Sequence, residues 1–228
     1  MSAYVFPAAL TPTVAVAGQS GRYPVHRIYC VGRNYAEHVR EMGADPAREP
    51  PIFFMKPADA VIASGERVPY PPRTDNFHHE IELVIAIGRV GRDIASDAAL
   101  DYVFGYAVGN DFTRRDLQAQ ALKAGLPWDT SKGFDHSAGI AAIRPVSAGH
   151  IRRGRIWLSV NGTLRQDSDV AEMIWSVPEI IAQLSTLFTL SPGDLIYSGT
   201  PAGVGPLVRG DVLEGGVEGL QTLVNTIA

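Results

Sequence analysis

Two glutamates, Glu80 and Glu82, occupy alternate positions of an apolar segment that runs from His79 to Ile87. If this segment is a β-strand, the two side chains share a face about 6.5–7 Å apart at the backbone, so both carboxylates can reach one cation. The alternative is that both glutamates lie on the solvated face of an antiparallel strand. The opposite face is apolar and consists of Ile81, Leu83, Ile85 and Ile87.

A third carboxylate, Asp111, ends another apolar run, residues 106–110, just before an expected helix. Polar residues at strand ends that lead into loops are frequent in functional sites. The alternative is that Asp111 caps the following helix. Together Glu80, Glu82 and Asp111 form an all-oxygen ligand set that suits Mg²⁺ or Mn²⁺ and leaves coordination positions for water and substrate.

A second constellation lies in the segment Gly32 to Glu41, where His38 and Glu41 are three residues apart. On a helix these side chains are neighbours on one face. A carboxylate beside an imidazole fixes its tautomer and raises its basicity, which a base that activates water requires. An ordinary surface pair on a charged helix is the alternative.

The segment Gly199 to Gly205 contains three glycines and follows an expected strand. Its backbone N–H groups can approach an anion closely, and Thr200 adds a hydroxyl group. No Lys-Ser/Thr follows the glycines, so the segment is not a P-loop, and a plain tight turn is the alternative. Lys132 is an isolated cation in an expected loop and has no interpretation by itself.

Four helices are expected to position these residues, at 34–42, 97–104, 114–123 and 178–188. Ser96 is the expected N-cap of the second, and Thr113 with Asp116 has capping-box-like spacing at the third. Ser176 and Glu179 predict a capping box for the fourth. Strands are expected at 27–31, 52–55, 80–87, 105–110, 156–160, 195–197 and 220–227, and a type I′ hairpin turn at Asn161-Gly162.

The composition indicates one compact, β-rich domain. Of 228 residues, 46% are hydrophobic and 19% charged, which excludes a disordered chain. The 23 glycines and 16 prolines favour many short elements joined by turns. The formal net charge of −4 argues against a nucleic-acid partner, and no segment is apolar enough for a transmembrane helix. The single Cys30 excludes an intrachain disulfide and fits a reducing cytoplasm.

The first 25 residues need a separate interpretation. They are apolar, but they carry no lysine before residue 25 and no arginine before Arg22, and Pro7 and Pro12 interrupt the apolar run. A secretory signal needs a basic start and an uninterrupted apolar region. We therefore expect residues 1–25 to form an extended N-terminal arm and residues 26–228 to form the catalytic domain.

Several strings, in order along the chain, resemble the fumarylacetoacetate hydrolase family in its short-chain acylpyruvase branch. They cover about residues 27–224 and comprise VGRNY with His38 and Glu41, MKP at 55–57, HEIEL at 79–83, NDFTRRDLQ at 110–118, LPW at 126–128 with Lys132, and GTPAGVG at 199–205. The segment 34–42 and the long arm are most similar to fumarylpyruvate hydrolases of the gentisate pathway.

The resemblance implies an α+β, β-rich fold, a mixed β-roll with flanking short helices, in a homodimer. It implies that Glu80, Glu82 and Asp111 bind a divalent cation, usually Mg²⁺, with Lys132 beside it. His38 and Glu41 would belong to a short helix that orders over bound substrate. The pocket for the pyruvate end of the substrate would be lined by Arg115, Gln118 and Thr200.

On this basis the sequence predicts a hydrolase that acts on a 2,4-diketo acid and cleaves the bond between C3 and C4 of an acylpyruvate. Water activated by the His38–Glu41 pair would attack the 4-carbonyl, and the metal with Lys132 would stabilise the enolate charge. Oxaloacetate decarboxylation or tautomerisation and 2-hydroxydienoate isomerisation pass through a similar enolate and are the alternatives. A carboxylate-binding module without turnover is a further alternative. The acyl group (fumaryl, maleyl or acetyl) stays open.

Overall fold

The computed structural model describes residues 4–43 and 49–228, and its centre is an eight-stranded mixed sheet. Along the sheet the strand order is β4-β3-β15-β8-β9-β11-β5, and β12 pairs with β9. Two pairs are parallel, β15 with β3 and β11 with β5, and the others are antiparallel. The bounds are β3 Ile28–Gly32, β4 Ile52–Lys56, β5 Val61–Ala63, β8 Ile81–Ile87, β9 Val103–Asp111, β11 Ala138–Ile140, β12 Arg144–Pro145 and β15 Leu195–Tyr197.

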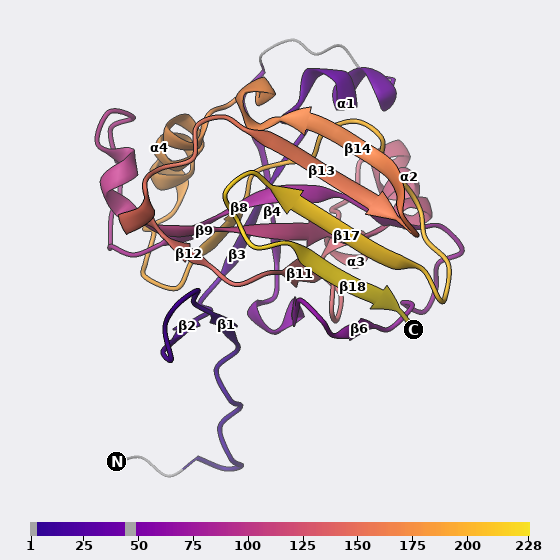
Figure 1. Cartoon of the computed structure of the whole chain (residues 1–228), viewed down its shortest axis with the longest axis horizontal. Coiled ribbons are helices and arrows are strands. Elements are labelled where there is room, and N and C mark those ends of the chain that lie inside the picture. The colour runs from indigo at the N-terminus through magenta and orange to yellow at the C-terminus, as the bar shows by residue number, and fades with distance from the viewer. Residues whose placement is uncertain (1–3, 44–48) are drawn as a thin grey trace.

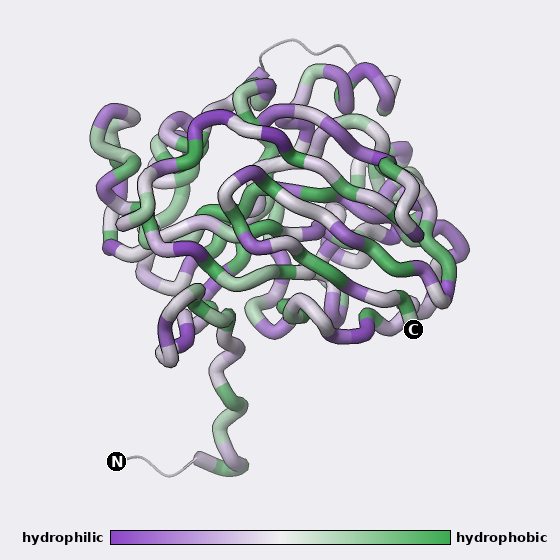
Figure 2. The backbone as a smooth tube through the Cα atoms, viewed as in Figure 1, coloured by the Kyte–Doolittle hydropathy of each residue, from purple (hydrophilic) through white to green (hydrophobic). Residues whose placement is uncertain are grey.

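A second, five-stranded sheet lies across the first and appears in front of β8 and β9 in Figure 1. Its order is β14-β13-β17-β18-β6. Hydrophobic and hydrophilic residues alternate along much of its length (Figure 2), because only one face is turned toward the central sheet. The bounds are β6 Arg67–Val68, β13 Arg155–Val160, β14 Thr163–Asp169, β17 Val212–Val217 and β18 Leu223–Ile227.

The central strand β8 is buried on both faces, since each of its residues is buried. One face packs into the core between the two sheets through Ile81, Leu83, Ile85 and Ile87. The other face contributes Val84 and Ala86 to a second apolar cluster, which the N-terminal hairpin of β1 (Thr13–Ala15) and β2 (Arg22–Pro24) helps to cover. A solvated face for Glu80 and Glu82 is therefore wrong.

The helices are short and lie around the rim of the sheets (Figure 1): α1 Ala36–Glu41, α2 Arg115–Ala124, α3 Asp129–Lys132 and α4 Val177–Leu187. The capping box of Ser176 and Glu179 at α4 is confirmed. α2 ends at Gly125, which is in the left-handed conformation, and no side chain caps its start, so the capping-box-like spacing of Thr113 and Asp116 forms no cap. The helix expected at 97–104 is wrong, because residues from Val103 onward pair with β8 and leave one 3₁₀ turn.

The remaining elements are short. A third sheet has the order β10-β7-β16, with bounds β7 Phe77–His79, β10 Thr113–Arg114 and β16 Gly205–Pro206. The 3₁₀ turns are η1 Ala58–Ala60, η2 Ala99–Tyr102, η3 Val146–Ala148 and η4 Val170–Glu172. Asn161 and Gly162 join β13 to β14 with φ of 52° and 76°, which confirms the expected hairpin. No helix among the described residues is long and apolar enough to cross a membrane.

Candidate active site

Three buried carboxylates meet where β8 and β9 adjoin. Glu80 immediately precedes β8, Glu82 lies within it, and Asp111 ends β9. The antiparallel register brings them together, since the Asp111 N–H donates to the Glu80 carbonyl at 2.8 Å. One carboxylate oxygen from each residue lies within 4.8 Å of the others. The structure thus brings together the three predicted metal ligands and leaves no helix-capping role for Asp111.

Three cations surround these carboxylates. The Lys132 ammonium lies 2.7 Å from Glu80 Oε2 and 2.7 Å from Asp111 Oδ2, and the Arg115 guanidinium pairs with Glu80. Lys56, at the end of β4, lies 2.7 Å from Asp111 Oδ1. Sequence reasoning assigned no role to Lys56, although a lysine that ends an apolar strand is a signal for a buried ion pair.

The two glutamates differ in their electrostatic surroundings. Burial disfavours the Glu80 carboxylate, but Lys132 and Arg115 more than offset it and hold the pKa of Glu80 well below its usual range. Burial raises the pKa of Glu82, and the negative charges of Asp111 and Glu80 raise it further. Among the described residues Glu82 has no ion pair and accepts only the Gly199 N–H, at 2.8 Å. A hard divalent cation fits this all-oxygen set because it would neutralise Glu82.

The predicted pair of His38 and Glu41 is formed on α1. His38 is buried, and its Nδ1–H donates to Glu41 Oε2 at 3.0 Å. This bond leaves Nε2 as the ring nitrogen that can accept a proton. The second Glu41 oxygen accepts the Gly203 N–H at 3.0 Å. His38 lines the same pocket as the three carboxylates, so it is not part of an ordinary surface pair.

The glycine-rich segment binds anions, but these are the protein's own carboxylates. Its Gly199 N–H donates to Glu82 and its Gly203 N–H donates to Glu41. Both glycines have positive φ, 98° and 95°. A Cβ on Gly199 would lie 2.6 Å from the Cβ of Asn34. The segment therefore connects α1 to the acidic cluster, which is formed by Glu80, Glu82 and Asp111.

We expect Gly199→Ala to destabilise the fold more than Gly210→Ala. Both positions have positive φ, which costs an alanine about 1–2 kcal/mol. At Gly210 a Cβ would meet open space, whereas at Gly199 it would contact Asn34. The difference in the free energy of unfolding, measured by urea denaturation, should be about 1–3 kcal/mol, the usual cost of overpacking. Equal destabilisation would show that the close approach to Asn34 is unimportant.

The hydroxyl of Thr200 is oriented by Gln166, a buried residue of β14 that sequence reasoning missed. Gln166 Oε1 accepts from Ile81 N–H at 3.1 Å, and Nε2 donates to the Pro201 carbonyl at 2.8 Å. These backbone groups fix the amide orientation, so Nε2 must donate to Thr200 Oγ1, at 2.8 Å. The Thr200 hydroxyl hydrogen is therefore available to a group in the pocket.

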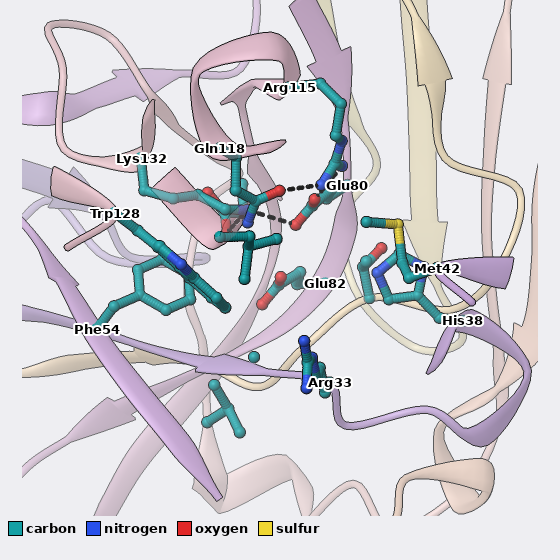
Figure 3. A pocket seen from close by; sticks show the side chains of 15 residues that line it. Arg33, His38, Met42, Phe54, Glu80, Glu82, Arg115, Gln118, Trp128 and Lys132 are labelled. Carbon is teal, nitrogen blue, oxygen red and sulfur yellow. Dashed lines mark hydrogen bonds and ion pairs between the residues drawn. The ribbon is translucent and has the colours of Figure 1, made fainter. Parts of the chain in front are cut away.

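The pocket above the acidic cluster combines charged and apolar walls. Arg115, Gln118 and Thr200 line it together with Lys132, so all three predicted substrate-binding residues lie in one cavity. Figure 3 shows Arg115 and Gln118 on one side of Glu82, Arg33 on the other, and Phe54 with Trp128 along the wall. Val31, Met42 and Leu122 complete the apolar part.

Fold and site together match a known class of enzyme. The family model described as "Fumarylacetoacetate (FAA) hydrolase C-terminal" matches residues 27–228, and the chain belongs to this family. This confirms the resemblance found in the sequence and the expected strand-rich α+β fold with short helices.

Particular relatives are close over nearly their whole length. The chain is 46% identical to a fumarylpyruvate hydrolase of Ralstonia sp over 183 residues, 80% of this chain and 95% of that protein. It is 43% identical to the human protein "Oxaloacetate tautomerase FAHD1, mitochondrial" over 86% of this chain and 89% of that one. The crystal structure of fumarylpyruvate hydrolase from Pseudomonas aeruginosa in complex with Mn²⁺ and pyruvate matches with a TM-score of 0.97, 48% identity and 99% coverage of both chains.

Proposed function

We propose that this protein is a metal-dependent hydrolase that cleaves the C3–C4 bond of an acylpyruvate, with fumarylpyruvate as substrate and fumarate and pyruvate as products. The observation that carries this proposal is that a buried three-carboxylate cluster and the His38–Glu41 pair line or adjoin one pocket. The Pseudomonas aeruginosa relative, crystallised with Mn²⁺ and pyruvate, supports both the metal and the product.

In this proposal Glu80, Glu82 and Asp111 hold a divalent cation, Mg²⁺ with Mn²⁺ as a substitute. When bound, the cation polarises the oxygens at the pyruvate end and stabilises negative charge that develops there. Arg115, Gln118 and Thr200 bind the pyruvate end of the 2,4-diketo acid. Thr200 suits this role because its hydroxyl hydrogen is directed away from Gln166.

The chain's own groups account for the proton movements. Glu41 accepts the Nδ1–H of His38, so Nε2 removes a proton from water as the water oxygen bonds to C4. The C3–C4 bond then breaks, and its electron pair forms the enolate of pyruvate. The Lys132 ammonium, held at the acidic cluster, stabilises this charge. His38 can return its proton to C3, which completes pyruvate.

The charge of the site favours a doubly negative substrate. Four carboxylates, Glu80, Glu82, Asp111 and Glu41, are matched by four basic side chains, Lys56, Lys132, Arg115 and Arg33. A bound divalent cation therefore leaves two positive charges, which a dicarboxylate neutralises. Such a site attracts a dianion more strongly than a monoanion.

A second candidate function is tautomerisation or decarboxylation of oxaloacetate, favoured by the 43% identity to the human oxaloacetate tautomerase. The His38–Glu41 pair favours hydrolysis, because neither alternative needs activated water. When purified protein is incubated with Mg²⁺ and fumarylpyruvate, fumarate and pyruvate should form in equal amounts. In a parallel assay with oxaloacetate, keto–enol conversion and loss of CO₂ are measured. Turnover of oxaloacetate without hydrolysis of any acylpyruvate would favour the second function.

We further propose that the protein is a cytoplasmic homodimer in the catabolism of aromatic compounds, with residues 1–25 as an arm outside the catalytic domain 26–228. The family match begins at residue 27, which supports this division. The start of the described arm exposes Tyr4, Val5, Phe6 and Leu10 and extends away from the body in Figure 1, whereas β1 and β2 pack against the central sheet. Light scattering on the full chain would measure the oligomeric state.

A further inference from the structure

Arg33 has a backbone conformation that few arginines adopt. Its φ is 59°, in the left-handed region, where a side chain costs about 1–2 kcal/mol. The next residue, Asn34, is fully buried and holds the chain in place. Its side chain donates to the carbonyls of Ser198 at 2.7 Å and Trp175 at 3.0 Å, and accepts the Trp175 N–H at 2.7 Å. The surrounding structure therefore fixes Arg33 in this conformation, which is frequent at functional sites.

Arg33 is an exposed residue at the mouth of the pocket, and within the described ranges 4–43 and 49–228 no hydrogen bond or ion pair engages its guanidinium. The three other basic side chains at the site, Lys56, Lys132 and Arg115, each contact a carboxylate. Arg33 lines the pocket opposite Arg115 and Gln118, with Glu82 between them (Figure 3). It also borders a neighbouring depression lined by Pro51 and Trp175.

We propose that Arg33 is a specificity-determining residue that binds the carboxylate at the acyl end of the substrate. This inference rests on the proposed acylpyruvate hydrolysis. If Arg115, Gln118 and Thr200 hold the pyruvate end, the acyl chain extends past the acidic cluster toward Arg33. An arginine suits this task because its planar fork binds a carboxylate with two hydrogen bonds.

The wall between the two ends fits a flat, unsaturated chain. Phe54 and Trp128 lie together, with ring centroids 5.6 Å apart. Trp128 packs closely against residue 32, where a Cβ in place of the glycine hydrogen would lie 3.3 Å from the indole ring. An acyl group with a carbon–carbon double bond and a terminal carboxylate would contact the rings and reach the guanidinium. The preferred substrate is thus an acylpyruvate with an unsaturated dicarboxylate acyl group.

The test compares Arg33→Gln with the wild type on two substrates, fumarylpyruvate and acetylpyruvate, which lacks the terminal carboxylate. For fumarylpyruvate we expect kcat/KM to fall about 10–100-fold, mainly through KM, the range expected for a lost charged hydrogen bond. For acetylpyruvate kcat/KM should change less than about threefold, because that substrate never contacts Arg33. Arg33→Lys should restore part of the loss. The control Arg92→Gln also removes an arginine charge, at an exposed site, and should change kcat/KM for neither substrate.

A parallel fall for both substrates would overturn the assignment, because it would mean that Arg33 supports the site generally. If Arg33→Gln fails to fold, Arg33→Asn replaces it, since asparagine tolerates positive φ.

If the wild type hydrolyses no acylpyruvate, the proposed function fails, and a binding experiment still tests the role of Arg33. By calorimetry on the Mn²⁺-loaded protein, fumarate should then bind more tightly than crotonate, and Arg33→Gln should remove that difference. Equal binding of fumarate and crotonate to the wild type would contradict the role of Arg33.

Discussion

Removal of divalent cations with EDTA is expected to abolish hydrolysis of acylpyruvates, and added Mg²⁺ or Mn²⁺ to restore it. The reason is that Glu82 is buried against two other carboxylates and, among the described residues, accepts a hydrogen bond only from the Gly199 N–H, while Lys132 adds a smaller electrostatic stabilisation. A divalent cation supplies that stabilisation and also the main positive charge for the developing enolate. The activity measurement is pyruvate release before chelation, after it and after readdition of metal.

Glu82→Gln should weaken the metal site without changing the shape of the side chain. An amide oxygen lacks the negative charge that hard cations prefer. We expect the Kd for Mn²⁺ to rise by at least about 10–100-fold, the loss found for residues that merely support metal ligands. Glu214→Gln, which alters an exposed glutamate on β17, is the matched control. Full activity after exhaustive chelation would refute the metal site.

His38→Ala is expected to lower kcat for acylpyruvates by about 10²–10⁴-fold, the usual contribution of a positioned base. KM should change less, because in the proposed function the bound cation with Arg115, Gln118 and Thr200, and not the imidazole, supplies most of the substrate binding. The loss should appear in single-turnover measurements as well, since it affects bond cleavage and not product release. An unchanged rate of hydrolysis in His38→Ala would exclude the histidine as the base.

Glu41→Gln should cost nearly as much as His38→Ala for a reason that the hydrogen bonds supply. The new amide can still accept the Gly203 N–H with its oxygen, but it then presents an NH₂ group to His38 Nδ1. Nδ1 must accept that bond, which moves the imidazole proton to Nε2 and leaves no base toward the substrate. The double variant should lose little more than the worse single variant, because the two residues act as a unit.

Oxaloacetate provides the control reaction for this pair. Decarboxylation needs no activated water, so any such activity of the wild type should survive His38→Ala and Glu41→Gln better than hydrolysis does. A parallel fall of both activities would instead assign the pair to substrate binding or to the closure of α1. Thermal unfolding of each variant, with a Tm near that of the wild type, would separate either result from misfolding.

The acidic cluster was predictable because its residues are marked by short patterns within single strands. Alternation along β8 and the strand end at Asp111 placed three carboxylates on one side of one sheet. The surroundings of that side were not predictable, since they come from distant segments. Lys56 reaches Asp111 across 55 positions of sequence, and Gln166 reaches Ile81 across 85. The end of an apolar strand marks Lys56 only as a candidate for a buried ion pair and names no partner, and no local pattern marks Gln166.

The strand β17 was missed for a similar physical reason. Gly215 and Gly216 weaken a strand when it is judged by composition. In the fold they are required, because a Cβ on Gly215 would lie 2.4 Å from Ile81 Cδ1 and a Cβ on Gly216 would lie 2.8 Å from Trp157 Nε1. Gly215 thus allows β17 to pack against β8 of the central sheet, and Gly216 leaves room for Trp157 of the neighbouring strand β13.

The position of β15 decides when the central sheet can be completed during synthesis. This strand, Leu195–Tyr197, lies between β3 and β8, so the central sheet stays divided until the ribosome has released nearly nine-tenths of the chain. Until then the facing edges of β3 and β8 carry unpaired backbone groups beside buried apolar side chains, which is a surface that chaperones bind and that aggregates. The central sheet is thus completed only when β15 pairs with both of those edges.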